Sequence, residues 1–155
     1  MGTDITYTYE IRQHGVWEAV KFLPPLDIDH VELEDAEWTA YTSHPACIDR
    51  NYRLFSVLAG VRNSFGIQSI ASPRGLPVDA SAESQKMTIN YTRNPNWDFP
   101  NLTWVSLREL LDYDWDQWIT DSRHEHEPPR LLREEVEPFT SKTLPYLQSL
   151  VSDRK

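Results

Sequence analysis

The chain has 155 residues, a formal net charge of −9 at pH 7 and a high aromatic content of six Trp, seven Tyr and five Phe. The negative charge argues against general binding to DNA or RNA, and a single cysteine excludes an intramolecular disulfide and a cysteine-based zinc site. No apolar run is long enough to span a membrane and residues 1–10 lack the features of a secretory signal, so we expect a soluble, cytoplasmic protein with no membrane partner.

The first predicted element is a β-hairpin. Residues 5–11 alternate apolar and polar side chains, which is the pattern of a half-buried strand. His14 and Gly15 supply a turn, and residues 16–22 form the expected returning strand. Residues 27–37 are acidic with few apolar side chains, which predicts a solvated loop or an edge strand.

A largely buried helix is predicted over residues 49–63, with Asp49 as its N-cap. Apolar side chains cover more than half of its helical wheel, and Arg50 and Arg62 fall inside this apolar arc. A buried guanidinium must find a partner, because an uncompensated buried charge costs about 3–5 kcal/mol.

The second half of the chain predicts loops and short helices. After a loop over residues 64–80, Asp79 or Ser81 could cap a short helix that runs toward residue 90. Residues 94–100 form an aromatic-rich connector, and the Ser106–Glu109 capping box starts another helix. The remaining predicted segments are an exposed, flexible loop over 121–130 and helices over 130–137 and 143–152.

Together these elements predict one α+β domain over residues 1–155. Its small antiparallel sheet is opened by the N-terminal hairpin and packs against the helices.

No pattern of catalytic or metal-binding residues is complete. His124 and His126 lack the spacing that places two imidazoles on one helical face, and the acidic run that begins at Asp112 lacks the glycine and glutamate of a calcium loop. Nucleophile elbows, phosphate-binding loops and dinucleotide fingerprints are also missing. We therefore expect no catalytic residue, metal or cofactor, and an enzyme of unknown class is only the third hypothesis.

Charge is distributed unevenly along the chain. Residues 50–95 have a net charge of +4, so the rest of the chain sums to −13. A cationic middle in an acidic protein indicates either an anion-binding site or arginines paired with acidic residues such as Asp112, Asp114 or the 27–37 segment. The sequence leaves both alternatives open.

The first functional hypothesis is a non-catalytic binder of a small anionic, nucleotide-like ligand. Arginine side chains would contact the anion and aromatic rings would stack on the ligand. The candidate residues are Arg50, Arg53, Arg62 and Arg74 for the anion, and Tyr52, Trp97 and Trp104 for stacking.

The second hypothesis is a protein-interaction module or a homo-oligomeric structural protein. Exposed Trp115 and Trp118 would anchor its interface, because tryptophan is enriched at interaction hot spots.

Three blocks of sequence, over residues 50–63, 74–81 and 106–115, resemble a family of uncharacterised proteins encoded by bacteriophages and bacteria. The resemblance carries no catalytic residue across. Its phage setting implies a location in the host cytoplasm and a role in counter-defence, in which the protein would sequester a nucleotide signal made by host immunity.

Overall fold

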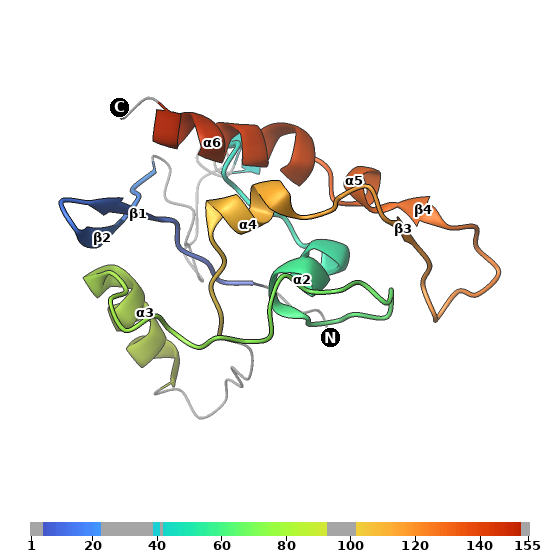
Figure 1. Ribbon diagram of the computed structural model, residues 1–155, viewed down its shortest axis with the longest axis horizontal. Coiled ribbons are helices and arrows are strands. Elements are labelled where there is room, and N and C mark those ends of the chain that lie inside the picture. Colours follow the sequence, from blue (N-terminus) through green and yellow to red (C-terminus); the bar gives the residue numbers. More distant parts are fainter. Residues whose placement is uncertain (1–4, 23–38, 41, 93–101, 153–155) are drawn as a thin grey trace.

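The computed structural model describes residues 5–22, 39–40, 42–92 and 102–152 (Figure 1). Strands β1 (Glu10–Gln13) and β2 (Val16–Ala19) form the predicted antiparallel hairpin, although β1 begins at Glu10 rather than residue 5 and β2 ends at Ala19 rather than residue 22. His14 and Gly15 at its turn both have positive φ, of 52° and 80°. Positive φ at both central residues is typical of a type I′ turn, whose twist matches that of the flanking strands.

Helix α2 (Tyr52–Ala59) lies at the centre of the core but is shorter than the predicted helix. Its N-cap is Asn51, whose side chain accepts hydrogen bonds from two backbone amides of the first turn. Gly60 ends the helix in the left-handed conformation with φ 69°, which glycine adopts without steric cost. Asp49 is therefore not the N-cap, and the predicted end at residue 63 lies four residues beyond the last helical residue, Ala59.

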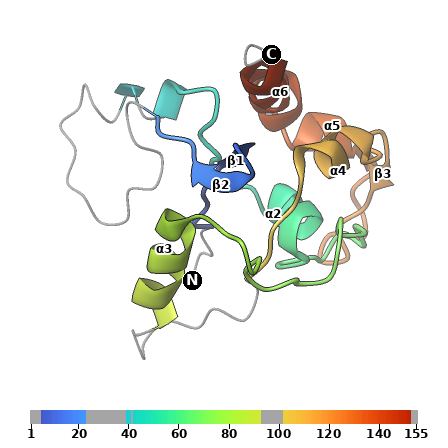
Figure 2. The same ribbon diagram turned by 60° about the vertical axis from the view of Figure 1, so that its left-hand side comes forward.

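The remaining elements follow in the second half of the chain. Helices α4, α5 and α6 gather on the same side of α2, and α3 lies on the far side of the β1–β2 hairpin from them (Figure 2). The elements are α3 (Ala82–Thr92), α4 (Leu107–Asp112), β3 (Trp118–Ile119), β4 (Arg130–Leu131), α5 (Leu132–Glu135), the π-helical turn η1 (Phe139–Thr143) and α6 (Leu144–Ser152).

Strands β3 and β4 were not predicted from the sequence. The predicted helix over 130–137 begins as strand β4, because Trp118 and Ile119 supply a pairing partner for Arg130 and Leu131. The described residues thus form two separate two-stranded antiparallel sheets rather than one. The α+β class is confirmed, as is the capping box at the start of α4, where Ser106 and Glu109 bond reciprocally.

The main hydrophobic core joins α2 to the C-terminal elements. Val57 and Leu132 are fully buried within it. Its other buried members are Leu54, Leu58, Phe65, Ile67, Leu110, Trp115, Ile119, Val136, Phe139 and Leu144.

A second, aromatic cluster links the hairpin to α6. Tyr7, Tyr9, Phe22 and Tyr146 pack around buried Ala46 and Cys47. The hydroxyl of Tyr9 donates to the carbonyl of Ala46, and the amide of Ile48 donates to the hydroxyl of Tyr7, both at 2.8 Å. These bonds tie residues 46–48 to the N-terminal segment.

Two predicted segments, the acidic stretch 27–37 and the connector 94–100, lie outside the described residues. In the described ranges no helix has the length and hydrophobicity to cross a bilayer.

Candidate functional site

The arginines predicted to bind an anion do not converge on one site. Arg50 precedes α2 and Arg62 follows it, and both side chains are exposed. The expectation that these two guanidinium groups are buried in the helix is therefore wrong, because α2 begins after one and ends before the other. The guanidinium of Arg62 lies 5.8 Å from the ring of Tyr52, which also packs against Phe55.

Arg74 contacts Glu109 in the first turn of α4. Its Nη1 donates to Glu109 Oε2 at 3.0 Å and its Nη2 donates to Glu109 Oε1, so the pair is bidentate. The same Glu109 Oε2 accepts from the amide of Ser106 at 2.8 Å. The Arg74 hydrogen bond, aided by the capping box, lowers the pKa of Glu109 to about 2. Arg74 is thus held by a carboxylate at the helix start.

Trp104 is a predicted stacking residue that contacts Arg74. The guanidinium lies 4.5 Å from the indole centroid, and Nη1 also donates to the carbonyl of Trp104 at 3.2 Å. The third predicted stacking residue, Trp97, lies outside the described residues.

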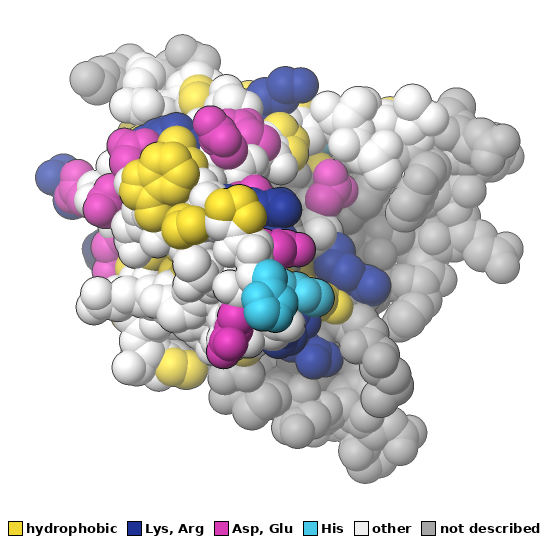
Figure 3. Space-filling model, turned by 90° about the vertical axis from the view of Figure 1, so that its right-hand side faces the viewer, with side chains coloured by type: hydrophobic (Ala, Val, Ile, Leu, Met, Phe, Trp, Pro, Cys, Tyr) yellow, Lys and Arg dark blue, Asp and Glu magenta, His cyan; other side chains and the backbone are white. Residues whose placement is uncertain are grey.

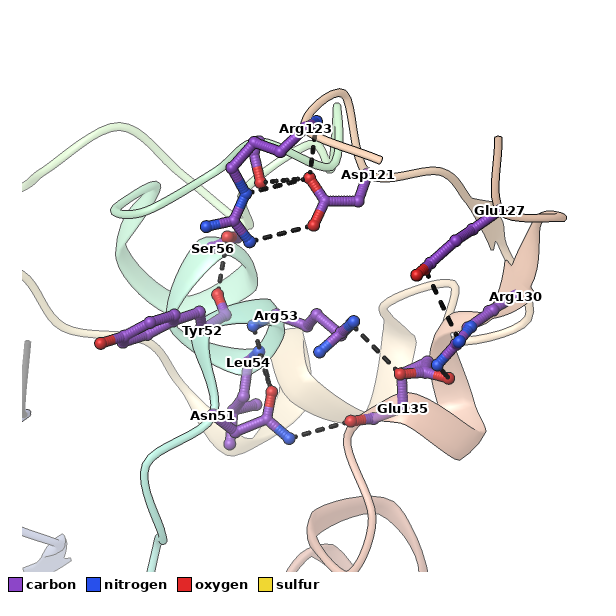
Figure 4. A network of polar contacts seen from close by, with 11 residues as sticks. Asn51, Tyr52, Arg53, Leu54, Ser56, Asp121, Arg123, Glu127, Arg130 and Glu135 are labelled. Atoms are coloured by element: carbon purple, nitrogen blue, oxygen red, sulfur yellow. Dashed lines mark hydrogen bonds and ion pairs between the residues drawn. The ribbon is translucent and has the colours of Figure 1, made fainter. Parts of the chain in front are cut away.

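Arg53 takes part in a polar network between α2, α5 and the loop that joins β3 to β4 (Figure 4). Its Nε lies 3.2 Å from Glu135 Oε2 as an ion pair, although this atom makes no hydrogen bond. Arg130 contacts Glu135 at 3.5 Å and Glu127 at 3.6 Å. These contacts draw the loop toward the N-terminal end of α2.

The network is electrically balanced. Arg123 pairs with Asp121 at 2.9 Å, and this pair, reinforced by a hydrogen bond from Ser64, holds the pKa of Asp121 well below its usual range. Its three arginines, Arg53, Arg123 and Arg130, thus face three carboxylates, those of Asp121, Glu127 and Glu135. A cavity of about 10 Å³, the space of one water molecule, lies between Arg53, Asp121, Glu127 and Arg130 of this network. A small anion would have to displace the carboxylates to bind here.

The two tryptophans expected at an interface differ sharply in exposure. Trp115 is only 2 % exposed, and its indole N–H donates to the carbonyl of Leu110 at 2.8 Å. The expectation that Trp115 is an exposed anchor is therefore wrong, because it fills the core against Phe139 and Tyr113. Trp118 on β3, by contrast, is 70 % exposed.

Trp118 and Leu131 are directly opposite each other in the β3–β4 ladder, so their side chains lie on the same outer face. Two positions further along, Asp116 accepts from Arg133 Nε at 2.8 Å and from Nη2 at 3.3 Å. We call the surface formed by Trp118, Leu131, Asp116 and Arg133 the hairpin face. Figure 3 looks onto the end of the molecule that carries β3 and β4, and shows hydrophobic side chains with acidic ones beside them.

The hairpin face was only partly predictable. Trp118 was singled out from the sequence, whereas Leu131, Asp116 and Arg133 were not. The register of the β3–β4 ladder could have identified them. Asp116 lies two residues before Trp118 and Arg133 two residues after Leu131, and side chains two residues apart along a strand lie on the same face.

Within the described parts of the chain, no three His, Cys, Asp or Glu side chains are grouped closely enough to hold a metal ion. The charge cluster at His124–Glu127 lies in the exposed loop between β3 and β4. In comparisons with known proteins, the chain matches no family model, no curated protein and no solved structure. The resemblance of its three sequence blocks to phage-encoded proteins stays a prediction.

Proposed function

We propose that this protein is a non-catalytic protein-interaction module that docks a partner on the hairpin face, with Trp118 as the anchor. The observation that carries this proposal is the exposure of 70 % of Trp118 on a strand that belongs to the folded core. Tryptophan is highly buried on average in folded proteins, and it is enriched among the residues that dominate binding energy at interfaces.

The platform under Trp118 supports the proposal because it is held from several sides. The neighbouring Ile119 is buried. The amide of Leu132 donates to the carbonyl of Gln117 at 2.8 Å, and the amide of Arg133 donates to the carbonyl of Trp115 at 2.9 Å. An anchor on a rigid backbone loses little conformational entropy on binding, which favours affinity.

The small-anion hypothesis has weaker support. Arg53 and Arg74 already contact carboxylates, so a nucleotide phosphate would have to replace Glu135 or Glu109. The phage counter-defence role built on nucleotide sequestration depends on the same arginines. We therefore rank it below the interaction module.

Selection of binders from a library of random linear peptides tests the proposal. We expect peptides that bind the wild-type chain and lose binding to Trp118→Ser. The matched control is Val16→Ser, which removes another exposed apolar side chain (60 % exposed) from the β1–β2 hairpin at the opposite end of the molecule (Figure 1).

Two results would overturn the proposal. One is the absence of selected peptides, or peptides that bind wild type and Trp118→Ser equally well. The other is a thermal shift from a nucleotide that disappears in Arg53→Met or Arg74→Met, which would restore the ligand hypothesis.

A further inference from the structure

We infer that the partner of the hairpin face presents lysine or arginine side chains, one of which lies on the indole of Trp118. This inference rests on the proposed interaction module and adds the chemical class of the partner. Three observations support it. They are the negative charge around the hairpin face, the carboxylates there that form no ion pair with a described side chain, and the arrangement of Arg74, Trp104 and Glu109 elsewhere in the protein.

The charge around the hairpin face is strongly negative. Residues 112–118 and 131–137 contain six carboxylates and one arginine, so these two segments have a net charge of −5, more than half of the −9 of the whole chain. One of the six, Glu135, points away to Arg53 and Arg130 in the polar network (Figure 4). The other five are exposed, and they are Asp112, Asp114, Asp116, Glu134 and Glu137.

Most of this negative charge is not neutralised by the described residues. Asp116 forms the ion pair with Arg133, and Glu137 accepts hydrogen bonds from the hydroxyls of Thr140 and Ser141. Among the described side chains, no cation forms an ion pair with Asp112, Asp114 or Glu134. A cationic partner could therefore bind here without breaking an existing ion pair.

In the described part of the chain, an indole, a carboxylate and a guanidinium already meet at Arg74. Arg74 lies 4.5 Å from the ring of Trp104 while it forks onto Glu109. An indole face attracts a cation through its quadrupole, and the carboxylate supplies a charged acceptor. The hairpin face offers the first two members of this arrangement, Trp118 and the surrounding carboxylates, on a surface that a partner can reach.

A second copy of this chain fits the hairpin face less well. Two copies would bring the same acidic segments together, and each chain carries −9. Like charges at close range oppose association, and this opposition is strongest at low salt.

The test uses the peptides selected on the wild-type chain and a charge-matched pair of variants. Asp114→Asn with Glu134→Gln changes the net charge from −9 to −7 beside Trp118, and Glu18→Gln with Glu83→Gln makes the same change near the other hairpin. Asparagine at position 114 keeps the acceptor oxygen that bonds the amide of Asp116. We expect lysine- and arginine-rich peptides whose affinity falls by about threefold or more in the first variant and stays unchanged in the second.

The possible outcomes separate the inference from the proposed function. Cationic peptides that need both Trp118 and the two local carboxylates, and that weaken as salt rises, support the inference. Peptides that need Trp118 but carry no cationic excess, or that respond equally to both charge variants, overturn the inference and leave the interaction module standing. Light scattering that shows a dimer lost in Trp118→Ser would also overturn it, because a second copy would then be the partner.

Discussion

At the scale of single residues, two of the predicted anion-binding arginines join separate elements of the fold. Arg74 clamps Glu109 at the start of α4, and Arg53 joins α2 to Glu135 of α5. Both pairs are partly shielded from water, where an ion pair contributes more than at a fully exposed surface. Their role in stability can be measured separately from any role in binding.

Arg74→Met should lower the free energy of unfolding by about 1–3 kcal/mol, because Glu109 loses its bidentate partner next to the α4 cap. Urea denaturation measures this change. Arg108→Met is the matched control on the same helix, and its exposed side chain should matter by less than about 0.5 kcal/mol. Equal effects of the two substitutions would contradict a stabilising role of the Arg74–Glu109 pair.

Glu109 should make stability depend on acid pH. Its pKa in the folded protein is lowered from 4.5 to about 2, so the carboxylate stabilises the fold above pH 4.5 and this contribution is lost as the pH falls toward 2. Denaturant unfolding between pH 5 and pH 2 should show the loss in wild type and a smaller one in Arg74→Met. The same pH dependence in both proteins would assign it to other carboxylates.

At the scale of elements, α2 is a largely buried helix, with six of its eight residues buried. Its Leu54, Val57 and Leu58 belong to the same core cluster as Leu110 of α4, Leu132 of α5 and Phe139 of η1. Asn51 and Gly60 fix where the helix begins and ends, so they also place Arg50 and Arg62 outside it.

Leu58→Ala should cost about 2–5 kcal/mol of unfolding free energy, because Leu58 is only 8 % exposed and its removal leaves a cavity. Chemical denaturation measures the loss. Val151→Ala on α6 is the control, and its half-exposed side chain should change stability by less than about 0.5 kcal/mol. A loss below about 1 kcal/mol for Leu58→Ala would place this residue outside the core.

The aromatic cluster between the hairpin and α6 should respond to pH through His44. Its ring contacts Phe22 and Tyr146, and its Nδ1 accepts from the amide of Ala46 at 3.1 Å, which requires the neutral imidazole. Burial lowers the pKa of His44 below 6.5. The stabilisation is therefore present above pH 6.5 and is lost as the pH falls through the lowered value.

An NMR titration of His44 should give a midpoint below 6.5. The thermal stability of wild type should fall between pH 7 and pH 5 more than that of His44→Phe. A midpoint at or above 6.5 would show that the ring is solvated or paired with an acid.

At the scale of the whole molecule, the acidic charge and the location of Trp118 decide how the protein can associate. A net charge of −9 opposes the association of copies, while the hairpin face combines an exposed indole with local carboxylates. These two properties favour a different, cationic partner over self-association.

Light scattering at physiological salt should therefore give the mass of one chain, and Trp118→Ser should leave that mass unchanged. A stable dimer in both proteins would indicate an interface elsewhere on the molecule, away from the hairpin face.

Local patterns in the sequence were sufficient to predict several features of the structure. The alternation over residues 5–11 with His14 and Gly15 predicted the first hairpin, and Ser106 with Glu109 predicted the cap of α4. Each of these features depends on residues a few positions apart, whose backbone preferences act before the chain is packed.

Only the tertiary structure decided which side chains are buried and which charges are paired. Trp115 and Trp118 look equivalent in the sequence, yet Trp115 packs in the core against Phe139, whereas Trp118 on β3 is exposed. In the same way, the partner of Arg74 is Glu109, thirty-five residues away. Such outcomes depend on contacts between distant segments, which form only when the whole core is assembled, so local patterns could not fix them.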